Sequence, residues 1–161
     1  IGRVQLKKLP KFIQQRKDNW DYLRAGLIAS EDFIDFALPT HATSWDISNG
    51  FSWDKTSCKS DCSWFGFKIS VKQGAPFSRT DLAKELDSHK IGNRMLFGGN
   101  LIRQPAFVEL LKNDQNAFRS AVDIINADKI MNDTLFLGTY PGLTKSMMDY
   151  EIETIIKFTK K

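Results

Sequence analysis

The sequence predicts a domain of mixed helices and strands, of the α/β (α+β) class, with a short sheet of about three strands flanked by helices. A long helical pattern opens the chain. Three short segments rich in β-branched and aromatic residues follow it, separated by further helical patterns. The 161 residues, of which 42% are hydrophobic and 26% charged, suffice for one domain with its own core.

The first helix is expected within residues 1–29 and would connect to whatever precedes it. Its apolar residues recur at steps of three, four and seven and form one stripe: Leu6, Leu9, Ile13, Trp20, Leu23 and Leu27. Pro10 lies inside this pattern and should either kink the helix or mark the start of a new one. A second, short helix is expected at residues 30–36, where Ser30 is a good N-cap.

Residues 38–62 are expected to form a long loop excursion. A loop of this length is either functional or a surface excursion held by its own aromatic side chains, and the sequence leaves both readings open. Cys58 and Cys62, the two cysteines of the chain, lie here with C-x₃-C spacing. Because a closed metal site normally needs four Cys or His ligands, we expect two free thiols, no metal and a reducing, cytoplasmic location.

The next elements carry clearer signals. Residues 64–71 (WFGFKISV) alternate and are rich in aromatic and β-branched side chains, which predicts a strand. Ser78, followed three residues later by Asp81, forms a variant capping box and predicts the start of a helix. A short strand at residues 93–97 then runs into a Gly-Gly turn.

The C-terminal third is expected to be mostly helical around one more strand. Helices are predicted at residues 105–111 and 115–125, and a strand at residues 134–137 that ends in a Tyr-Pro-Gly turn. The final helix should begin after Thr144, which is a good N-cap.

Several functional classes find no support in the sequence. It contains no G-x-x-x-x-G-K-[ST], G-x-G-x-x-G, H-E-x-x-H or G-x-S-x-G motif. Its two histidines, His41 and His89, are far apart and lack the context of a catalytic triad. The net charge of +4 comes from scattered Lys and Arg residues, and no apolar run is long enough to span a membrane. We therefore expect neither a nucleic acid nor a membrane as a partner.

The most unusual stretch is RMLFGGNLIRQP, residues 94–105. Arg94, Arg103 and Asn100 frame the turn at Gly98 and Gly99. Glycines let a backbone come close to a ligand, and guanidinium groups suit phosphate or carboxylate oxygens. The residues alone predict either a ligand-binding loop or a structural turn with ordinary surface arginines.

Four segments in this order resemble a known family: VQLKKLPKF (4–12, preceded by Ile1 and Gly2), SWFGFKI (63–69), RMLFGGNLIRQPAF (94–107) and MNDTLFLGTYPGLT (131–144). They are similar to the C-terminal part of CDP-4-keto-6-deoxy-glucose 3-dehydrases, which belong to the sugar aminotransferase superfamily with the aspartate-aminotransferase fold. The resemblance implies that residues 1–161 form the small C-terminal domain and that a large cofactor-binding domain lies upstream. Residues 38–62 do not share it.

The resemblance also implies a reaction. Such an enzyme uses pyridoxamine 5′-phosphate to remove the C3 hydroxyl of a CDP-4-keto-6-deoxyhexose, on a route to the 3,6-dideoxysugars of lipopolysaccharide O antigen. The catalytic His and the cofactor-binding residues would lie upstream, as would the cysteines of the 2Fe–2S cluster that some members carry. We therefore expect no catalytic residue and no cofactor in this chain, which alone should be inactive. A homodimer and an iron–sulfur flavoprotein reductase are the implied partners.

Substrate contacts are the role that the resemblance leaves to this chain. It implies that Phe65, where related aminotransferases often have His, contacts the substrate or the cofactor, and that Phe97 forms a wall of the substrate site. Arg94, Asn100 and Arg103 would be its polar contacts, around the turn at Gly98 and Gly99. The stripe on the first helix would face the large domain. Two alternatives remain, an ordinary pyridoxal-phosphate sugar aminotransferase and a non-catalytic α/β binding module.

Overall fold

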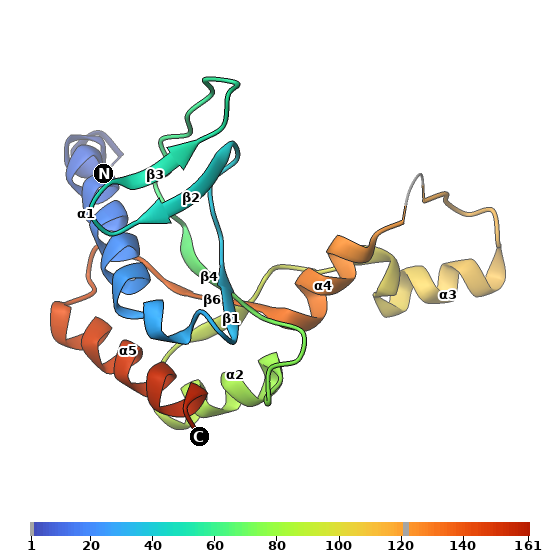
Figure 1. The fold of residues 1–161 in the computed structure, drawn as a ribbon. Coiled ribbons are helices and arrows are strands. Elements are labelled where there is room, and N and C mark those ends of the chain that lie inside the picture. Colours follow the sequence, from blue (N-terminus) through green and yellow to red (C-terminus); the bar gives the residue numbers. More distant parts are fainter. Residues whose placement is uncertain (1, 121–122) are drawn as a thin grey trace.

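The computed structural model, which describes residues 2–120 and 123–161, contains a four-stranded antiparallel sheet with helices packed against it (Figure 1). The strands lie in the order β1 (Ile34–Phe36), β4 (Gly66–Val71), β6 (Thr134–Gly138) and β5 (Asn93–Met95). This mixed architecture confirms the predicted fold class, with four strands in the sheet in place of about three.

Three helices form the core side of the molecule. They are α1 (Gly2–Gly26), α2 (Arg79–Ser88) and α5 (Lys145–Thr159) (Figure 1). Helix α5 contacts both α1 and α2, α1 contacts β4, and α2 contacts β5 and β6. On the sheet, Phe67 lies opposite Leu137 and Ile69 opposite Leu135, and all four side chains are fully buried. Because successive side chains of a strand point to opposite faces, the even-numbered neighbours of these residues lie on the other face.

Two further helices continue from the sheet. Helix α4 (Ile125–Asp133) contacts β4 and β6, and α3 (Pro105–Asn113) extends away from the body of the molecule (Figure 1). Short 3₁₀ turns, η1 (Ile28–Ser30) and η2 (Leu101–Arg103), follow α1 and precede α3. Among the described residues, no helix combines the length and the apolar character needed to cross a membrane.

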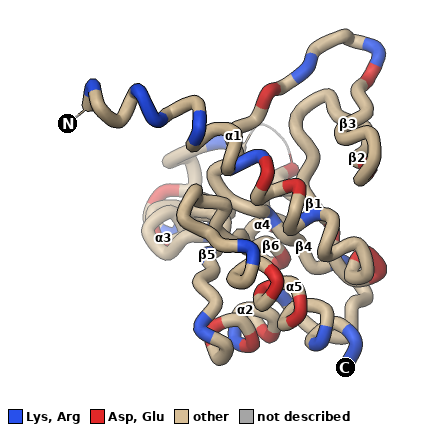
Figure 2. The backbone as a smooth tube through the Cα atoms, turned by 90° about the vertical axis from the view of Figure 1, so that its left-hand side faces the viewer, with Lys and Arg blue, Asp and Glu red and all other residues tan. Residues whose placement is uncertain are grey.

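The predicted apolar stripe on α1 is buried only over its second half. Trp20, Leu23 and Leu27 belong to the core, whereas Leu6 is 66% exposed. The first half is also basic, with no acidic residue before Asp18 (Figure 2). Pro10 lies inside α1 and the helix continues through it, so the helix is not divided there. Ile1, the first residue of the range predicted for this helix, lies outside the described residues.

An aromatic junction joins α1 to the rest of the molecule. Trp20 is 1% exposed and stacks on Trp64, with ring centroids 4.7 Å apart and an interplanar angle of 13°. Phe51 and Trp45 pack against the same indole at 5.2 and 6.0 Å. Such ring pairs add to the stabilisation that burial gives.

Two predictions for residues 30–62 are wrong. Residues 34–36 form strand β1 instead of a helix, because Ile34 pairs with Val71 and buries its side chain, and this pairing outweighs the local N-cap signal. The predicted loop contains a hairpin of β2 (Ala42–Asp46) and β3 (Gly50–Trp53). Its aromatic side chains supply the burial that a two-stranded hairpin needs.

The helix predicted at residues 115–125 is also wrong over its described part. Residues 115–120 form a turn and irregular chain, residues 121–122 lie outside the described residues, and the helix begins at Ile125. The other predicted elements are confirmed, including the capping box in which Ser78 and Asp81 exchange side-chain and backbone hydrogen bonds.

We predict that Trp20→Ala lowers the free energy of unfolding by about 3–5 kcal/mol, because it empties the centre of the junction. Chemical denaturation measures this. Trp53→Ala is the matched control, since Trp53 is half-buried and its ring contacts only Phe51 among the described rings. Equal losses of unfolding free energy in the two variants would contradict the conclusion that Trp20 is the centre of the aromatic junction.

A second prediction concerns Glu151 on α5, which is 9% exposed. Burial raises the pKa of its carboxyl from 4.5 to about 7. The folded chain therefore binds the carboxyl proton more tightly than the unfolded chain does. The contribution to stability is complete below the unfolded pKa, so stability should fall as pH rises from about 4.5 through 7. Glu151→Gln should remove up to about 3 kcal/mol of this dependence, measured by denaturation across pH. Glu153→Gln, at an exposed site on the same helix, should leave it unchanged.

Candidate functional site

The face of the sheet opposite the core carries a row of two cations and one aromatic ring. Phe136 on β6 lies directly opposite Lys68 on β4 and opposite Arg94 on β5. Side chains at directly opposed positions of antiparallel strands share a face and are close neighbours. The register therefore places Lys68, Phe136 and Arg94 side by side across three strands.

Two exposed phenylalanines extend this row into an aromatic surface. Phe65 precedes β4 and is 69% exposed, and Phe97 follows β5 and is 77% exposed. Their ring centroids lie 6.2 Å apart, and each lies within 6.1 Å of Phe136. We call Phe65, Phe97 and Phe136 the aromatic face. Exposed clusters of apolar side chains mark binding surfaces more often than isolated ones do.

The loop after β5 holds Phe97 in this exposed position. Phe97 has a left-handed backbone with φ of 49°, and its N–H donates to the carbonyl of Met95 at 2.8 Å. Gly99 also has positive φ, at 60°, and a Cβ there would lie 2.6 Å from Cγ of Met131. Backbone strain of this kind persists only where the surroundings impose it. The turn at Gly98 and Gly99 is therefore a close approach to α4.

Asn100 and Arg103 are turned toward Asp128 on α4. Asn100 is 3% exposed and donates to Oδ1 of Asp128 at 2.7 Å. Arg103 places Nε and Nη2 at 3.1 and 3.0 Å from the two carboxylate oxygens. The hydrogen bonds from Arg103 and then Asn100 lower the pKa of Asp128. In this structure the two predicted polar contacts anchor the loop, and their contact with a substrate stays a prediction.

Arg94, the other arginine of the motif, does not share the contact of Arg103 with Asp128. Its Nη1 donates to the backbone carbonyl of Asn93 at 2.9 Å, and within residues 2–120 and 123–161 it forms no ion pair. The structure thus brings Phe65, Phe97 and Arg94 to one face of the sheet, and Gly98 and Gly99 form the turn that follows Phe97. Sequence reasoning missed Phe136 and Lys68. The alternation of the strands at residues 64–71 and 134–137 contained the signal for both.

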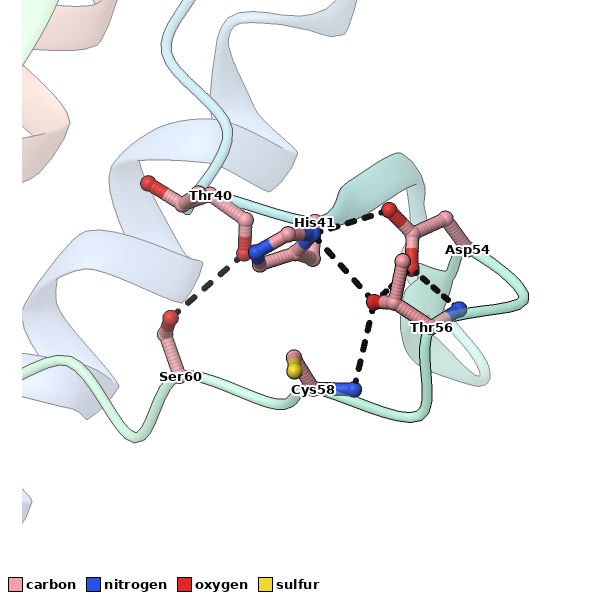
Figure 3. A network of polar contacts seen from close by, with 6 residues as sticks. All are labelled: Thr40, His41, Asp54, Thr56, Cys58 and Ser60. Atoms are coloured by element: carbon pink, nitrogen blue, oxygen red, sulfur yellow. Dashed lines mark hydrogen bonds and ion pairs between the residues drawn. The ribbon is translucent and has the colours of Figure 1, made fainter.

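A polar network closes the β2–β3 hairpin (Figure 3). Nδ1 of His41 lies 2.9 Å from Oδ2 of Asp54, and the Thr56 hydroxyl donates to the other oxygen of Asp54. The hydrogen bonds from Thr56, then that from His41, lower the pKa of Asp54 to about 2. Cys58 joins through its backbone N–H, which donates to Thr56. These contacts fasten the ends of the hairpin.

Neither cysteine takes part in a metal cluster in the described part of the chain. Cys58 and Cys62 are both free, and no group of three or more His, Cys, Asp or Glu side chains among the described residues is placed to hold a metal ion.

Comparison with known proteins identifies the family. Residues 1–156 match the DegT/DnrJ/EryC1/StrS aminotransferase family. The chain belongs to this family. It is 38% identical over 157 residues to the lipopolysaccharide biosynthesis protein RfbH of Salmonella typhimurium, which covers 98% of this chain and 31% of that protein. It is 37% identical over 161 residues to the dTDP-4-dehydro-2,6-dideoxy-D-glucose 3-dehydratase of Saccharopolyspora spinosa, covering 100% of this chain and 30% of that protein.

Solved structures agree with this placement. The GDP-4-keto-6-deoxymannose-3-dehydratase ColD with bound GDP-perosamine superposes with a TM-score of 0.69 at 27% identity, covering 96% of this chain and 33% of that one. The aminotransferase from Psychrobacter cryohalolentis gives a TM-score of 0.72 at 16% identity, over 99% of this chain and 37% of that one, and shows the fold alone. The chain spans about a third of the length of these relatives.

We predict that Gly99→Ala destabilises the protein more than Gly74→Ala. Both glycines have positive φ, but a Cβ at Gly74 meets no atom within 4 Å, whereas one at Gly99 collides with Met131. The Gly74 variant should cost about 1–2 kcal/mol from backbone strain alone. Denaturation measures the difference, and equal costs would show that the loop does not depend on close approach to α4.

Proposed function

We propose that this chain is the C-terminal part of a pyridoxamine 5′-phosphate-dependent enzyme that removes the C3 hydroxyl of a nucleotide-linked 4-keto-6-deoxyhexose. The observation that carries the proposal is the 37% identity, over the whole chain, to a protein named as a sugar-nucleotide 3-dehydratase. The 38% identity to a protein of lipopolysaccharide biosynthesis supports the route to surface dideoxysugars. The resemblance favours CDP as the nucleotide, although the named relatives act on dTDP- and GDP-sugars.

The open sheet face fits one side of such a site. The aromatic face suits a flat ring or the apolar face of a sugar, and Lys68 and Arg94 beside Phe136 suit phosphate oxygens. When bound, the cofactor supplies an amine and an electron-withdrawing ring. The row of Lys68, Phe136 and Arg94 contains no imidazole and no carboxylate that could pair with a ring nitrogen. The proton-transferring group would therefore come from outside this chain.

The same reasoning gives the chain's role in the reaction. Phe65 and Phe97 would exclude water from one side of the bound sugar, and Arg94 would hold an anionic group of the substrate. Asn100 and Arg103 would act through Asp128 by fixing the loop that presents Phe97. The large N-terminal domain, the homodimer, the reductase partner and a cytoplasmic location belong to this proposal. Any 2Fe–2S cluster would be bound elsewhere, because the chain has only two cysteines.

The aminotransferase alternative has weaker support. The structures titled as aminotransferases are 16–22% identical and share the fold, whereas the 3-dehydratases reach 26–37% over most of this chain. Phe65, at the position where the resemblance places His in aminotransferases, also favours dehydration.

We predict that Arg94→Ala lowers kcat/KM for dehydration about 10- to 100-fold, because it removes a charge-assisted hydrogen bond to the substrate. The measurement uses the longer protein that contains this chain, with pyridoxamine 5′-phosphate and a CDP-4-keto-6-deoxyhexose, and follows loss of the C3 hydroxyl by mass spectrometry.

Lys84→Ala is the control, since Lys84 is an exposed cation on α2. Transamination without loss of the C3 hydroxyl would assign the protein to the aminotransferases. Cofactor binding without either reaction would contradict both enzymatic readings.

A further inference from the structure

The loop that carries Phe97 does not rest on a close-packed support. A cavity of about 270 Å³ adjoins it, lined by residues 95–99 and Gln104, by Met131 of α4 and by Arg79 of α2. Phe97 itself is 77% exposed and has a left-handed backbone, which persists only where the surroundings impose it. Because the cavity removes packing contacts on this side, polar contacts must carry more of the loop's position.

Among the described residues that line this cavity, Arg79 alone is charged. It is the first residue of α2 and is half-buried. Its Nε donates to the backbone carbonyl of Asn132 at 3.1 Å, and its Nη2 donates to that of Met131 at 3.2 Å. Both carbonyls belong to the last turn of α4, where the helix supplies no N–H for them and a cation is favourable. The guanidinium of Arg79 therefore fastens the C-terminal end of α4.

The same guanidinium reaches the strand that leads into the loop. Its Nη1 contacts the sulfur of Met95, the last residue of β5, and the carbonyl of Met95 accepts the N–H of Phe97 at 2.8 Å. Successive side chains of a strand point to opposite faces, so Met95 points away from the face that carries Arg94. Arg79 thus holds β5 from the side away from the proposed ligand surface.

A second path leads from Arg79 to Phe97 through α4. A Cβ at Gly99 would lie 2.6 Å from Cγ of Met131, so the side chain of Met131 lies directly against the turn that follows Phe97. Arg79 holds the backbone of Met131 by its carbonyl. The two paths, one through Met95 and one through Met131 and Gly99, therefore meet at Phe97.

We propose that Arg79 is a positioning residue for the aromatic face, which keeps Phe97 in its ligand-facing orientation by fastening Met95 and the end of α4 from behind. Its role in a reaction rests on the proposed function, whereas the fastening of the loop rests on contacts within this chain. The planar guanidinium serves several acceptors at once, and the ammonium of a lysine does not reproduce this geometry. Arg79→Lys should therefore preserve the role only in part.

The first test measures amide hydrogen exchange of the 161-residue chain by NMR. In Arg79→Ala, the amides of Phe97 and Gly99 should exchange about 10-fold faster than in the parent chain, because the opening of the loop costs less free energy. In Arg79→Lys their rates should lie between those of the parent and of Arg79→Ala. The amide of Ile91, which donates to the carbonyl of Leu86 at the other end of α2, should keep its rate.

The second test is a double-mutant cycle in the longer protein that contains this chain. Arg79→Ala should lower kcat/KM for dehydration about 10- to 100-fold, because small displacements of a positioning group carry costs of this order. In the Phe97→Ala background the same substitution should change kcat/KM less than about twofold, because residues that act through one another are not additive. Lys84→Ala, which removes an exposed cation of α2, should change neither exchange nor kcat/KM.

Three results would overturn the proposal: unchanged exchange at Phe97 and Gly99 in Arg79→Ala, equal acceleration at Ile91, or effects of the two substitutions on kcat/KM that multiply. The second of these would make Arg79 a general support of α2. If Arg79→Ala does not fold, Arg79→Lys provides the same comparisons. If the longer protein does not dehydrate its sugar, the proposed function fails, and the exchange rates of the chain still decide whether Arg79 holds Phe97.

Discussion

The structure depends on the anchoring of α1 at its second half. Trp20 stacks on Trp64, and the residue next to Trp64 is Phe65 of the aromatic face. The backbone at Trp64 is held from two sides, since its carbonyl accepts hydrogen bonds from Arg16 on α1 and from the Thr139 hydroxyl after β6, both at 2.8 Å. The position of Phe65 therefore follows from the packing of α1.

The same helix also holds the turn that follows β6. The side-chain amide of Asn19, adjacent to Trp20, donates to the backbone carbonyl of Tyr140 at 3.0 Å. This contact fixes the Tyr-Pro-Gly turn. One stretch of α1 thus holds both the start of β4, next to the aromatic face, and the turn after β6. The first half of α1, which is basic and carries exposed Leu6, contributes to neither of these contacts.

Much of the fold could be predicted from local signals, and the errors have a common cause. The capping box at Ser78 and the alternating strand at residues 64–71 are encoded in short segments, and both predictions are confirmed. Strand β1 and the β2–β3 hairpin were missed because long-range contacts create them. Ile34 becomes a strand residue by pairing with Val71, and Phe51 is held by the ring of Trp20.

The candidate site was also predicted only in the part that local sequence encodes. The motif at residues 94–105 indicated which residues matter, and the sheet register then placed Arg94 beside Phe136. The motif could not show that Asn100 and Arg103 turn to Asp128, because that residue lies 25 positions or more along the chain. The burial of Glu151 was not predicted either, because it arises only from the packing of α5 in the folded chain.

The central claim is that the aromatic face is a ligand-binding surface that this chain contributes to a larger site. A crystal structure of the longer protein with pyridoxamine 5′-phosphate and a sugar nucleotide tests it most directly. The account predicts ligand atoms within about 4.5 Å of the Phe65 and Phe97 rings, with an anionic group at Arg94. A structure in which protein side chains cover the aromatic face and the ligand lies elsewhere would contradict it.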